Sequence, residues 1–137
     1  PARRLQVKAL AQGGQIIDDS YNASPESVRA AIDVLASRPG RRVMVFGDMA
    51  ELGADAEQLH RQVGDYALAA DIDQLYTLGS LSANASAVFN GRHFSDMDSL
   101  KGPLFDEIER SDVTILVKGS RSSNMDLVVD MLLAEKS

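Results

Sequence analysis

The sequence predicts an α/β fold, a Rossmann-like three-layer open sheet that is mostly parallel, with an antiparallel edge hairpin at the N-terminus. Short apolar runs rich in β-branched residues alternate with amphipathic stretches at helical spacing. Each apolar run ends in a polar or glycine-containing loop. The 137 residues are too few for a closed eight-fold barrel but enough to bury a sizeable core. We therefore expect residues 1–137 to form one domain.

The edge hairpin is predicted by the first two apolar runs. Leu5, Val7 and Ala9 alternate with polar residues, as in a half-exposed strand, and the Gly-Gly pair at 13–14 supplies a turn. A buried strand is predicted over 15–19 because two adjacent isoleucines precede a pair of aspartates.

A helix is predicted directly after this strand and a polar turn. Ser24 is a favourable N-cap, and Pro25 suits the first helical position because its missing N–H is not needed there. An apolar stripe follows at helical spacing, made of Val28, Ala31, Ile32 and Leu35. The Arg-Pro-Gly sequence at 38–40 ends the helix.

The remaining chain continues the alternation. Further strands are predicted over 43–46, 74–78, 92–94 and 113–117, and further helices over 55–70, 81–89, 96–110 and from 125 onward. Gly102-Pro103 is expected to split or restart the helix in which it lies. Ser123 with Asp126 resembles a capping box for the last helix.

Composition excludes several classes of protein. The net charge of −6 argues against nucleic acid as the main partner, because no basic face offsets it. There are no cysteines, so neither disulfides nor a thiolate metal site is possible. The apolar runs are too short to cross a bilayer, and we expect no membrane partner. Since the chain opens at Pro1 without a Met, we expect it to be part of a longer protein.

Three polar clusters fall at the carboxyl ends of predicted strands. They are residues 18–24, Asp48 with Glu51, and residues 118–121. Because parallel strands end at the same edge of a sheet, and ligands of such sheets collect there, the clusters are predicted to face one cleft.

Each cluster has a functional and a structural interpretation. Asp19 can accept hydrogen bonds from ribose hydroxyls, but one of the two aspartates can instead cap local backbone N–H groups. Tyr21 and Asn22 can contact a base or a phosphate, while turn geometry alone also explains Asn22.

The other two clusters are equally open. Asp48 and Glu51 can bind an amine or a metal-linked water, or they can lie in a solvated loop. Lys118 and Arg121 suit a carboxylate or a phosphate, or they can balance Asp18 or Asp48. The two histidines, His60 and His93, do not have the spacing of zinc ligands.

Several nucleotide and hydrolase motifs are missing from the sequence. It contains no G-x-x-x-x-G-K-[ST] loop, no G-x-G-x-x-G after the first strand and no G-x-S-x-G elbow. The chain alone therefore has no Walker-type grip on a triphosphate.

Three motifs in order carry a resemblance to a known family. Asp18-Asp-Ser-Tyr-Asn-Ala-Ser-Pro25, Gly47-Asp-Met-Ala-Glu-Leu-Gly53 and Lys118-Gly-Ser-Arg-Ser122 resemble the C-terminal domain of Mur ligases. The likeness is to the branch that adds D-alanyl-D-alanine to UDP-N-acetylmuramoyl-tripeptide in peptidoglycan synthesis, and it extends from about Arg4 to the C-terminus. Ser24 stands where the family often has Asn.

The resemblance implies a three-domain, ATP-dependent amide ligase of the bacterial cytoplasm that works through an acyl phosphate. The N-terminal domain holds the UDP end of the substrate, and the central domain grips ATP and Mg²⁺. Both are absent from this chain, which the resemblance casts as the domain that closes over the cleft. We therefore expect no catalytic residue and no metal site here, and an isolated chain without ligase activity.

The resemblance also implies roles for single residues. The nucleotide-binding set is Asp19, which meets the ribose, with Tyr21, Asn22 and Ser24 in the turn beside it. The substrate-binding set is Asp48 and Glu51 for the incoming amine, and Lys118, Ser120 and Arg121 for carboxylates of the dipeptide or the growing peptide.

Two other classes of protein compete with this interpretation. A phosphoacceptor receiver domain also has paired acids after its first strand and a lysine after its last. It needs an aspartate at the end of its third parallel strand, whereas here that strand ends in Leu78-Gly79 and Asp48 comes one strand early. A nicotinamide-dependent oxidoreductase is disfavoured by the missing glycine fingerprint.

Overall fold

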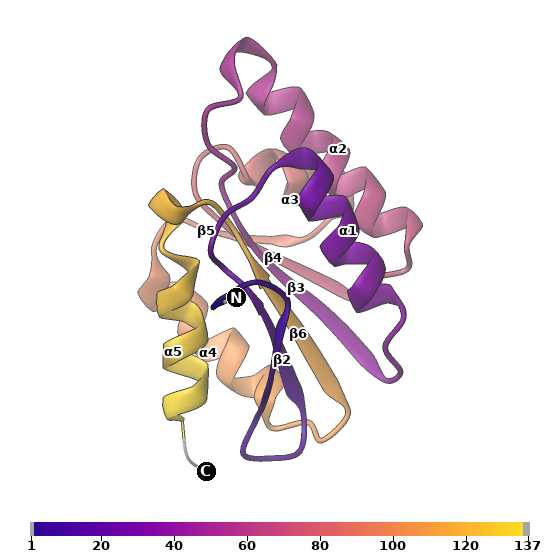
Figure 1. Cartoon of the computed structure of the whole chain (residues 1–137), viewed down its shortest axis with the longest axis vertical. Coiled ribbons are helices and arrows are strands. Elements are labelled where there is room, and N and C mark those ends of the chain that lie inside the picture. Colours follow the sequence, from indigo (N-terminus) through magenta and orange to yellow (C-terminus); the bar gives the residue numbers. More distant parts are fainter. Residues whose placement is uncertain (1, 136–137) are drawn as a thin grey trace.

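The computed structural model describes residues 2–135 and contains one six-stranded sheet flanked by helices (Figure 1). The strands are β1 (Gln6–Ala9), β2 (Gln15–Asp19), β3 (Arg41–Gly47), β4 (Gln74–Leu78), β5 (Arg92–Phe94) and β6 (Val113–Lys118). The α-helices are α1 (Pro25–Ala36), α2 (Ala56–Ala69), α3 (Ala83–Phe89), α4 (Met97–Ile108) and α5 (Met125–Ala134). Two short 3-10 helices, η1 (Gly53–Asp55) and η2 (Arg121–Ser123), precede α2 and α5.

The strand order is β1-β2-β6-β3-β4-β5, and only the β1–β2 pair is antiparallel. The predicted fold class and the edge hairpin are therefore confirmed. Insertion of β6 between β2 and β3 aligns three strand ends, because Lys118 lies opposite Asp19 on one side and Phe46 on the other. The loops that follow these three strands are consequently neighbours.

Two apolar cores hold the three layers together. The helices α1, α2 and α3 cover one face of the sheet, and α4 and α5 cover the other (Figure 1). The predicted stripe of α1 is buried: Val28, Ala31, Ile32 and Leu35 all have 0% exposure. Central strands are buried on both faces, as their continuous apolar runs indicate. Among the helices that the structure describes, none combines the length and apolar character that spanning a bilayer requires.

The prediction that Gly102-Pro103 splits a helix is wrong, because α4 runs unbroken from Met97 to Ile108. Pro103 removes one backbone hydrogen bond. Burial of Leu100 before it and Leu104 after it keeps both halves of the helix on the sheet.

The predicted capping box at the start of α5 is also wrong. Asn124, in a left-handed conformation, occupies the N-cap position and makes no side-chain cap. The Ser123 hydroxyl instead donates to the carbonyl oxygen of Ser120 at 2.7 Å. The Ser123 hydroxyl therefore stabilises the η2 turn and does not cap α5.

The alternation in β1 is present, but its apolar residues point to solvent. Leu5 is 44% exposed and Val7 49%, whereas Gln6 and Lys8 are half-buried. Lys8 turns inward to donate to Asp18, and Gln6 turns inward to accept from the backbone N–H of Arg3. Polar contacts, rather than hydrophobicity, decide which side of this edge strand is covered.

Candidate functional site

The three polar clusters share the carboxyl edge of the sheet, as predicted, but they line separate cavities and do not face one cleft. Lys118 at the end of β6 lies 2.9 Å from the carboxylate of Asp19 at the end of β2. The backbone N–H of Ser120 donates to the carbonyl oxygen of Asp48 at 3.0 Å, which joins the loops after β6 and β3. Three cavities open along this edge. Two are described below, and the third, of about 100 Å³, is smaller and is lined by Arg3, Ser20, Tyr21, Arg121, Asn124 and Asp126.

The larger cavity, here called the α1 cavity, has a volume of about 350 Å³ and lies beside the N-terminus of α1. Its polar lining includes Arg4, Asp19, Asn22, Ser24 and Lys118. Three of the four residues predicted to bind a nucleotide are therefore in one cavity. Ser24 also caps α1, since its side chain accepts from Ser27 N while the Ser27 hydroxyl accepts from Ser24 N.

Asp19 presents its carboxylate to the α1 cavity while two protein donors hold it. Oδ1 accepts from the backbone N–H of Leu5 at 3.1 Å, and Oδ2 pairs with Lys118. A carboxylate has about four acceptor positions, so capacity remains for ligand hydroxyls.

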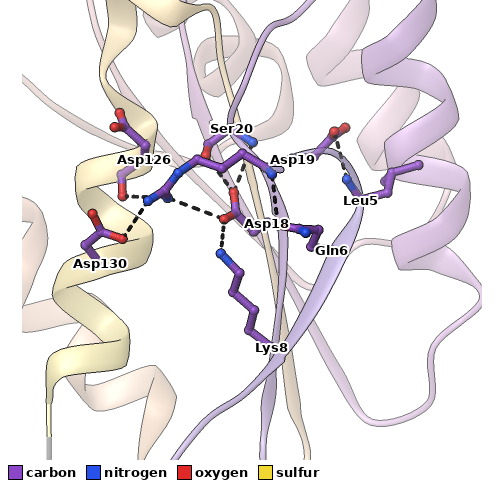
Figure 2. A network of polar contacts seen from close by, with 9 residues as sticks. Leu5, Gln6, Lys8, Asp18, Asp19, Ser20, Asp126 and Asp130 are labelled. Atoms are coloured by element: carbon purple, nitrogen blue, oxygen red, sulfur yellow. Dashed lines mark hydrogen bonds and ion pairs between the residues drawn. The ribbon is translucent and has the colours of Figure 1, made fainter. Parts of the chain in front are cut away.

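Asp18 serves the structure instead, which distinguishes the two aspartates. It is fully buried, and Figure 2 shows Lys8 and Ser20 turned toward its carboxylate. Lys8 Nζ lies 2.5 Å from Oδ2, and the Ser20 hydroxyl donates to Oδ1 at 2.6 Å. Burial alone would raise the pKa of Asp18, but the hydrogen bonds from Lys8 and Ser20 outweigh it and the pKa is lowered.

Arg3 extends this network to the last helix. Its guanidinium contacts Asp18 at 3.4 Å and pairs with Asp130 of α5 at 3.0 Å, and its carbonyl oxygen accepts from Tyr21 N–H. Figure 2 shows Asp126 and Asp130 on α5 beside the end of β2. The segment before β1 is thereby fastened to the turn that bears Tyr21.

Tyr21 stands between two arginines. The guanidinium of Arg4 lies 4.4 Å from the ring centroid, and that of Arg121 lies 5.2 Å from it. Sequence reasoning missed Arg4, because no motif marks it and only the fold of the preceding segment over β2 brings it there.

The second cavity, here called the β4 cavity, has a volume of about 230 Å³ and is lined by Asp48, Leu78, Gly79, Ser122 and Ser123. The Asp48 carboxylate accepts from Leu81 N, from Ser82 N and from the Ser82 hydroxyl. Gly79 has φ +114°, and a Cβ there would lie 2.5 Å from Asp48 Oδ1, so only glycine fits. Asp48 therefore shapes the cavity wall while it keeps part of its charge on the surface.

Glu51 is presented differently from Asp48. It is exposed, adopts a left-handed conformation with φ 61°, and makes no hydrogen bond or ion pair with the residues that the structure describes. The loop on its N-terminal side is anchored by Met49, whose side chain is buried and whose N–H donates to His60 Nε2 at 2.9 Å. His60 Nδ1 lies 2.7 Å from the carbonyl oxygen of Ala56, so the imidazole is neutral with its proton on Nδ1. His60 is therefore a satisfied structural histidine.

Ser120 and Arg121 follow Lys118 in opposite environments. Ser120 is buried, with its hydroxyl 3.1 Å from that of Ser122, and Arg121 is exposed beside Tyr21. Neither Ser120 nor Glu51 lines the α1 cavity or the β4 cavity.

The polar groups of the α1 cavity are of the kind that bind hydroxyls and anions. Within residues 2–135 there is no group of three or more His, Asp or Glu side chains arranged to hold a metal. The α1 cavity combines a carboxylate that can accept from hydroxyls with Arg4, an exposed cation for negatively charged groups, while the charge of Lys118 is matched by Asp19.

Comparison with known proteins finds a family and relatives that match most of the chain. Residues 3–121 match the family described as Mur ligase, glutamate ligase domain. The chain is 48% identical over 134 residues to UDP-N-acetylmuramoyl-tripeptide–D-alanyl-D-alanine ligase of Escherichia coli (strain K12), an alignment that covers 96% of this chain and 29% of the relative. The chain thus spans less than a third of that relative's length.

Solved structures are similar over the same extent. MurF from Acinetobacter baumannii superimposes with a TM-score of 0.90 at 29% identity, covering 98% of this chain and 30% of that one. MurF ligase from Thermotoga maritima, in complex with ADP, gives 0.81 at 27% identity, covering 95% and 30%. These comparisons give no support to a receiver domain, and the Asp48 carboxylate is already engaged by the 81–82 segment.

Proposed function

The chain belongs to the family of Mur ligase, glutamate ligase domains, and from that membership we propose that it is the closing domain of an ATP-dependent amide ligase. The ligase joins D-alanyl-D-alanine to UDP-N-acetylmuramoyl-tripeptide. This chain supplies one wall of the nucleotide site and part of the site for the incoming dipeptide. The relative from Escherichia coli carries the name of that reaction and is 48% identical over the shared length.

One observation carries the proposal: Asp19, Asn22, Ser24 and Lys118, drawn from two distant motifs, line a single cavity at the carboxyl edge. Open α/β sheets bind their ligands at this edge. The α1 cavity is open to solvent, as expected of a site completed by another domain. ADP in the related ligase from Thermotoga maritima supports a nucleotide as the ligand.

The proposed reaction has two steps. The terminal carboxylate of the tripeptide takes the γ-phosphoryl group of ATP, which gives an acyl phosphate and ADP. The dipeptide amine then attacks the acyl carbon, phosphate leaves with the C–O bond electrons, and the nitrogen loses a proton. Mg²⁺, held by the other domains, would neutralise phosphate charge. The residues of this chain bind and orient, which is the main requirement of phosphoryl transfer.

We assign the two cavities to the two substrates. Asp19 accepts from the ribose hydroxyls in the α1 cavity, with Tyr21 and Asn22 beside the base and phosphates. Asp48 and Glu51 attract the ammonium group of the dipeptide near the β4 cavity. Ser120 and Arg121 lie in the loop after β6, where Arg121, beside Tyr21, is an exposed cation able to meet a carboxylate.

The test is a ligation assay on the complete polypeptide that contains this chain. We expect formation of the UDP-linked pentapeptide, with one ADP and one phosphate released per bond, when ATP, tripeptide substrate and D-alanyl-D-alanine are all present. Purified residues 1–137 alone should form no product, because the sequence has no phosphate-binding loop. Ligation by the isolated chain, or none by the complete protein, would contradict the proposal.

A second measurement addresses the competing class. Incubation of the chain with acetyl phosphate should leave its mass unchanged, since Asp48 already accepts three hydrogen bonds. A phosphoryl adduct on Asp48 would favour the receiver interpretation.

A further inference from the structure

We propose that Lys118 is a positioning residue of the nucleotide cavity and not a ligand of the dipeptide carboxylate. The inference rests on the proposed function. It gives Lys118 a different role from the one that the family resemblance implies, which is binding of a substrate carboxylate. It begins from the burial of this lysine. Lys118 is 2% exposed, and a lysine so buried requires specific partners.

Its partners belong to the nucleotide side. Lys118 Nζ donates to the carbonyl oxygen of Asn22 at 2.7 Å and pairs with Asp19 Oδ2 at 2.9 Å. One ammonium group therefore fixes the end of β2 and the turn that follows it. Asp19 is held from its other oxygen by Leu5 N–H, so two donors from separate segments set the direction of the carboxylate. The remaining lone pairs of Asp19 face the α1 cavity.

The same contacts argue against a role for Lys118 in binding the dipeptide carboxylate. Its charge is already matched by Asp19, and it does not line the β4 cavity, where Asp48, Ser122 and Ser123 lie. Arg121, three residues further along, is exposed and carries an accessible cation. The two cations of the Lys-Gly-Ser-Arg motif thus have different roles. Lys118 orients Asp19, and Arg121 is exposed and able to contact a ligand.

A mechanism through Asp19 predicts a specific loss, namely discrimination for ribose hydroxyls. The experiment compares the kcat/KM of the complete ligase for ATP with its kcat/KM for 2′-deoxyATP and 3′-deoxyATP. We expect the wild-type enzyme to favour ATP over at least one deoxy analogue, and K118M to reduce that preference about tenfold, as loss of a well-oriented charged hydrogen bond would. D19N should reduce it to the same extent. The KM for D-alanyl-D-alanine should stay within about twofold of wild type in K118M, since no ligand contact is removed.

The matched control is K101M, which removes a lysine from the exposed surface of α4, where its ion pair within residues 2–135 is with the exposed Asp98. It should change neither the ribose preference nor either KM. The double variant D19N/K118M removes both charges, so no uncompensated charge stays buried even if K118M alone fails to fold. It should lose no more ribose preference than D19N alone, because both residues act through one interaction.

Other outcomes overturn the inference without touching the proposed function. An active K118M enzyme with a raised dipeptide KM and an intact ribose preference would place Lys118 at the dipeptide. A raised KM for ATP with an intact ribose preference would indicate a direct phosphate contact. Additive losses in D19N/K118M, or a wild-type enzyme indifferent to the ribose hydroxyls, would also refute it. Absence of ligation by the wild-type enzyme would instead refute the proposed function itself.

Discussion

Two buried ion pairs lie at opposite ends of the sheet. At the amino end, Arg41 at the start of β3 makes a bidentate pair with Glu107 of α4, with N–O distances of 2.6 and 2.8 Å. At the carboxyl end, Lys118 pairs with Asp19 at 2.9 Å. The two carboxylates are equally buried, at 6% and 7% exposure. They differ in what surrounds them.

The amino-end pair is closed by a third side chain. Tyr76 donates to Glu107 Oε2 at 2.7 Å, so protein donors engage both oxygens. Burial raises the pKa of Tyr76, the bond to Glu107 raises it further, and it reaches about 12. Burial would also raise the pKa of Glu107, but Arg41 and Tyr76 reverse this and lower it. The carboxyl-end pair instead borders a cavity of about 350 Å³. The same kind of interaction, a cation paired with a buried carboxylate, is thus closed by protein donors at one end of the sheet and borders the candidate ligand site at the other.

The largest effect expected from this comparison is the loss of the closed pair. E107A should lower the free energy of unfolding by about 3 kcal/mol, because Arg41 and Tyr76 lose their buried partner. Urea denaturation monitored by circular dichroism measures this. E109A, which truncates an exposed glutamate at the end of the same helix, is the matched control and should be within about 0.5 kcal/mol of wild type.

The same variant also tests whether the two ends are independent. In the complete ligase, E107A should leave the KM values for ATP and dipeptide unchanged at temperatures where the protein stays folded. A selective rise in the KM for ATP would mean that the amino-end pair helps to shape the nucleotide site, so the two ends of the sheet would not be independent.

A smaller effect is expected at Asp18, the buried neighbour of Asp19. Its pKa is lowered in the folded state, so it contributes stability above its unfolded pKa of about 4, and this is lost as the pH falls through the folded value. D18N should therefore cost about 2 kcal/mol at pH 7, and the difference from wild type should shrink as the pH is lowered toward 3. Urea unfolding of both proteins across this range measures the difference. A cost independent of pH would show that shape, not charge, makes Asp18 necessary.

The comparison also shows what a sequence can and cannot predict. Periodicity located every strand, because apolar runs between glycine and polar turns have few alternative structures, and β2 and β4 have the predicted limits. The common edge of the three motifs followed from parallel topology alone. The continuity of α4 through Pro103 could not be predicted, since it depends on the burial of Leu100 and Leu104 by the sheet.

Contacts between distant segments were beyond the sequence for the same reason. Arg4 reaches the site because its segment folds across β2, and Lys118 turns inward because β6 lies beside β2. Neither placement is encoded within a few residues of the side chain concerned. The residue types predicted that Lys118 and Arg121 bind an anion together. Only the strand order shows that Lys118 is buried against Asp19 while Arg121 is exposed.

The smallest expected change in stability concerns Glu51, which lies at the carboxyl edge of the sheet. Its backbone is strained, whereas Asp19 at the same edge is held by hydrogen bonds. A non-glycine residue at φ 61° costs roughly 1 kcal/mol, so E51G should raise the free energy of unfolding by up to about that amount. E51Q keeps the strain and should leave stability unchanged. Both variants should raise the KM for D-alanyl-D-alanine about threefold, the effect of one exposed charge on an ammonium group, as measured in the complete ligase. If E51G gains stability with no change in dipeptide KM, the left-handed glutamate has no binding role. The binding residues at the carboxyl edge would then be those that line the cavities.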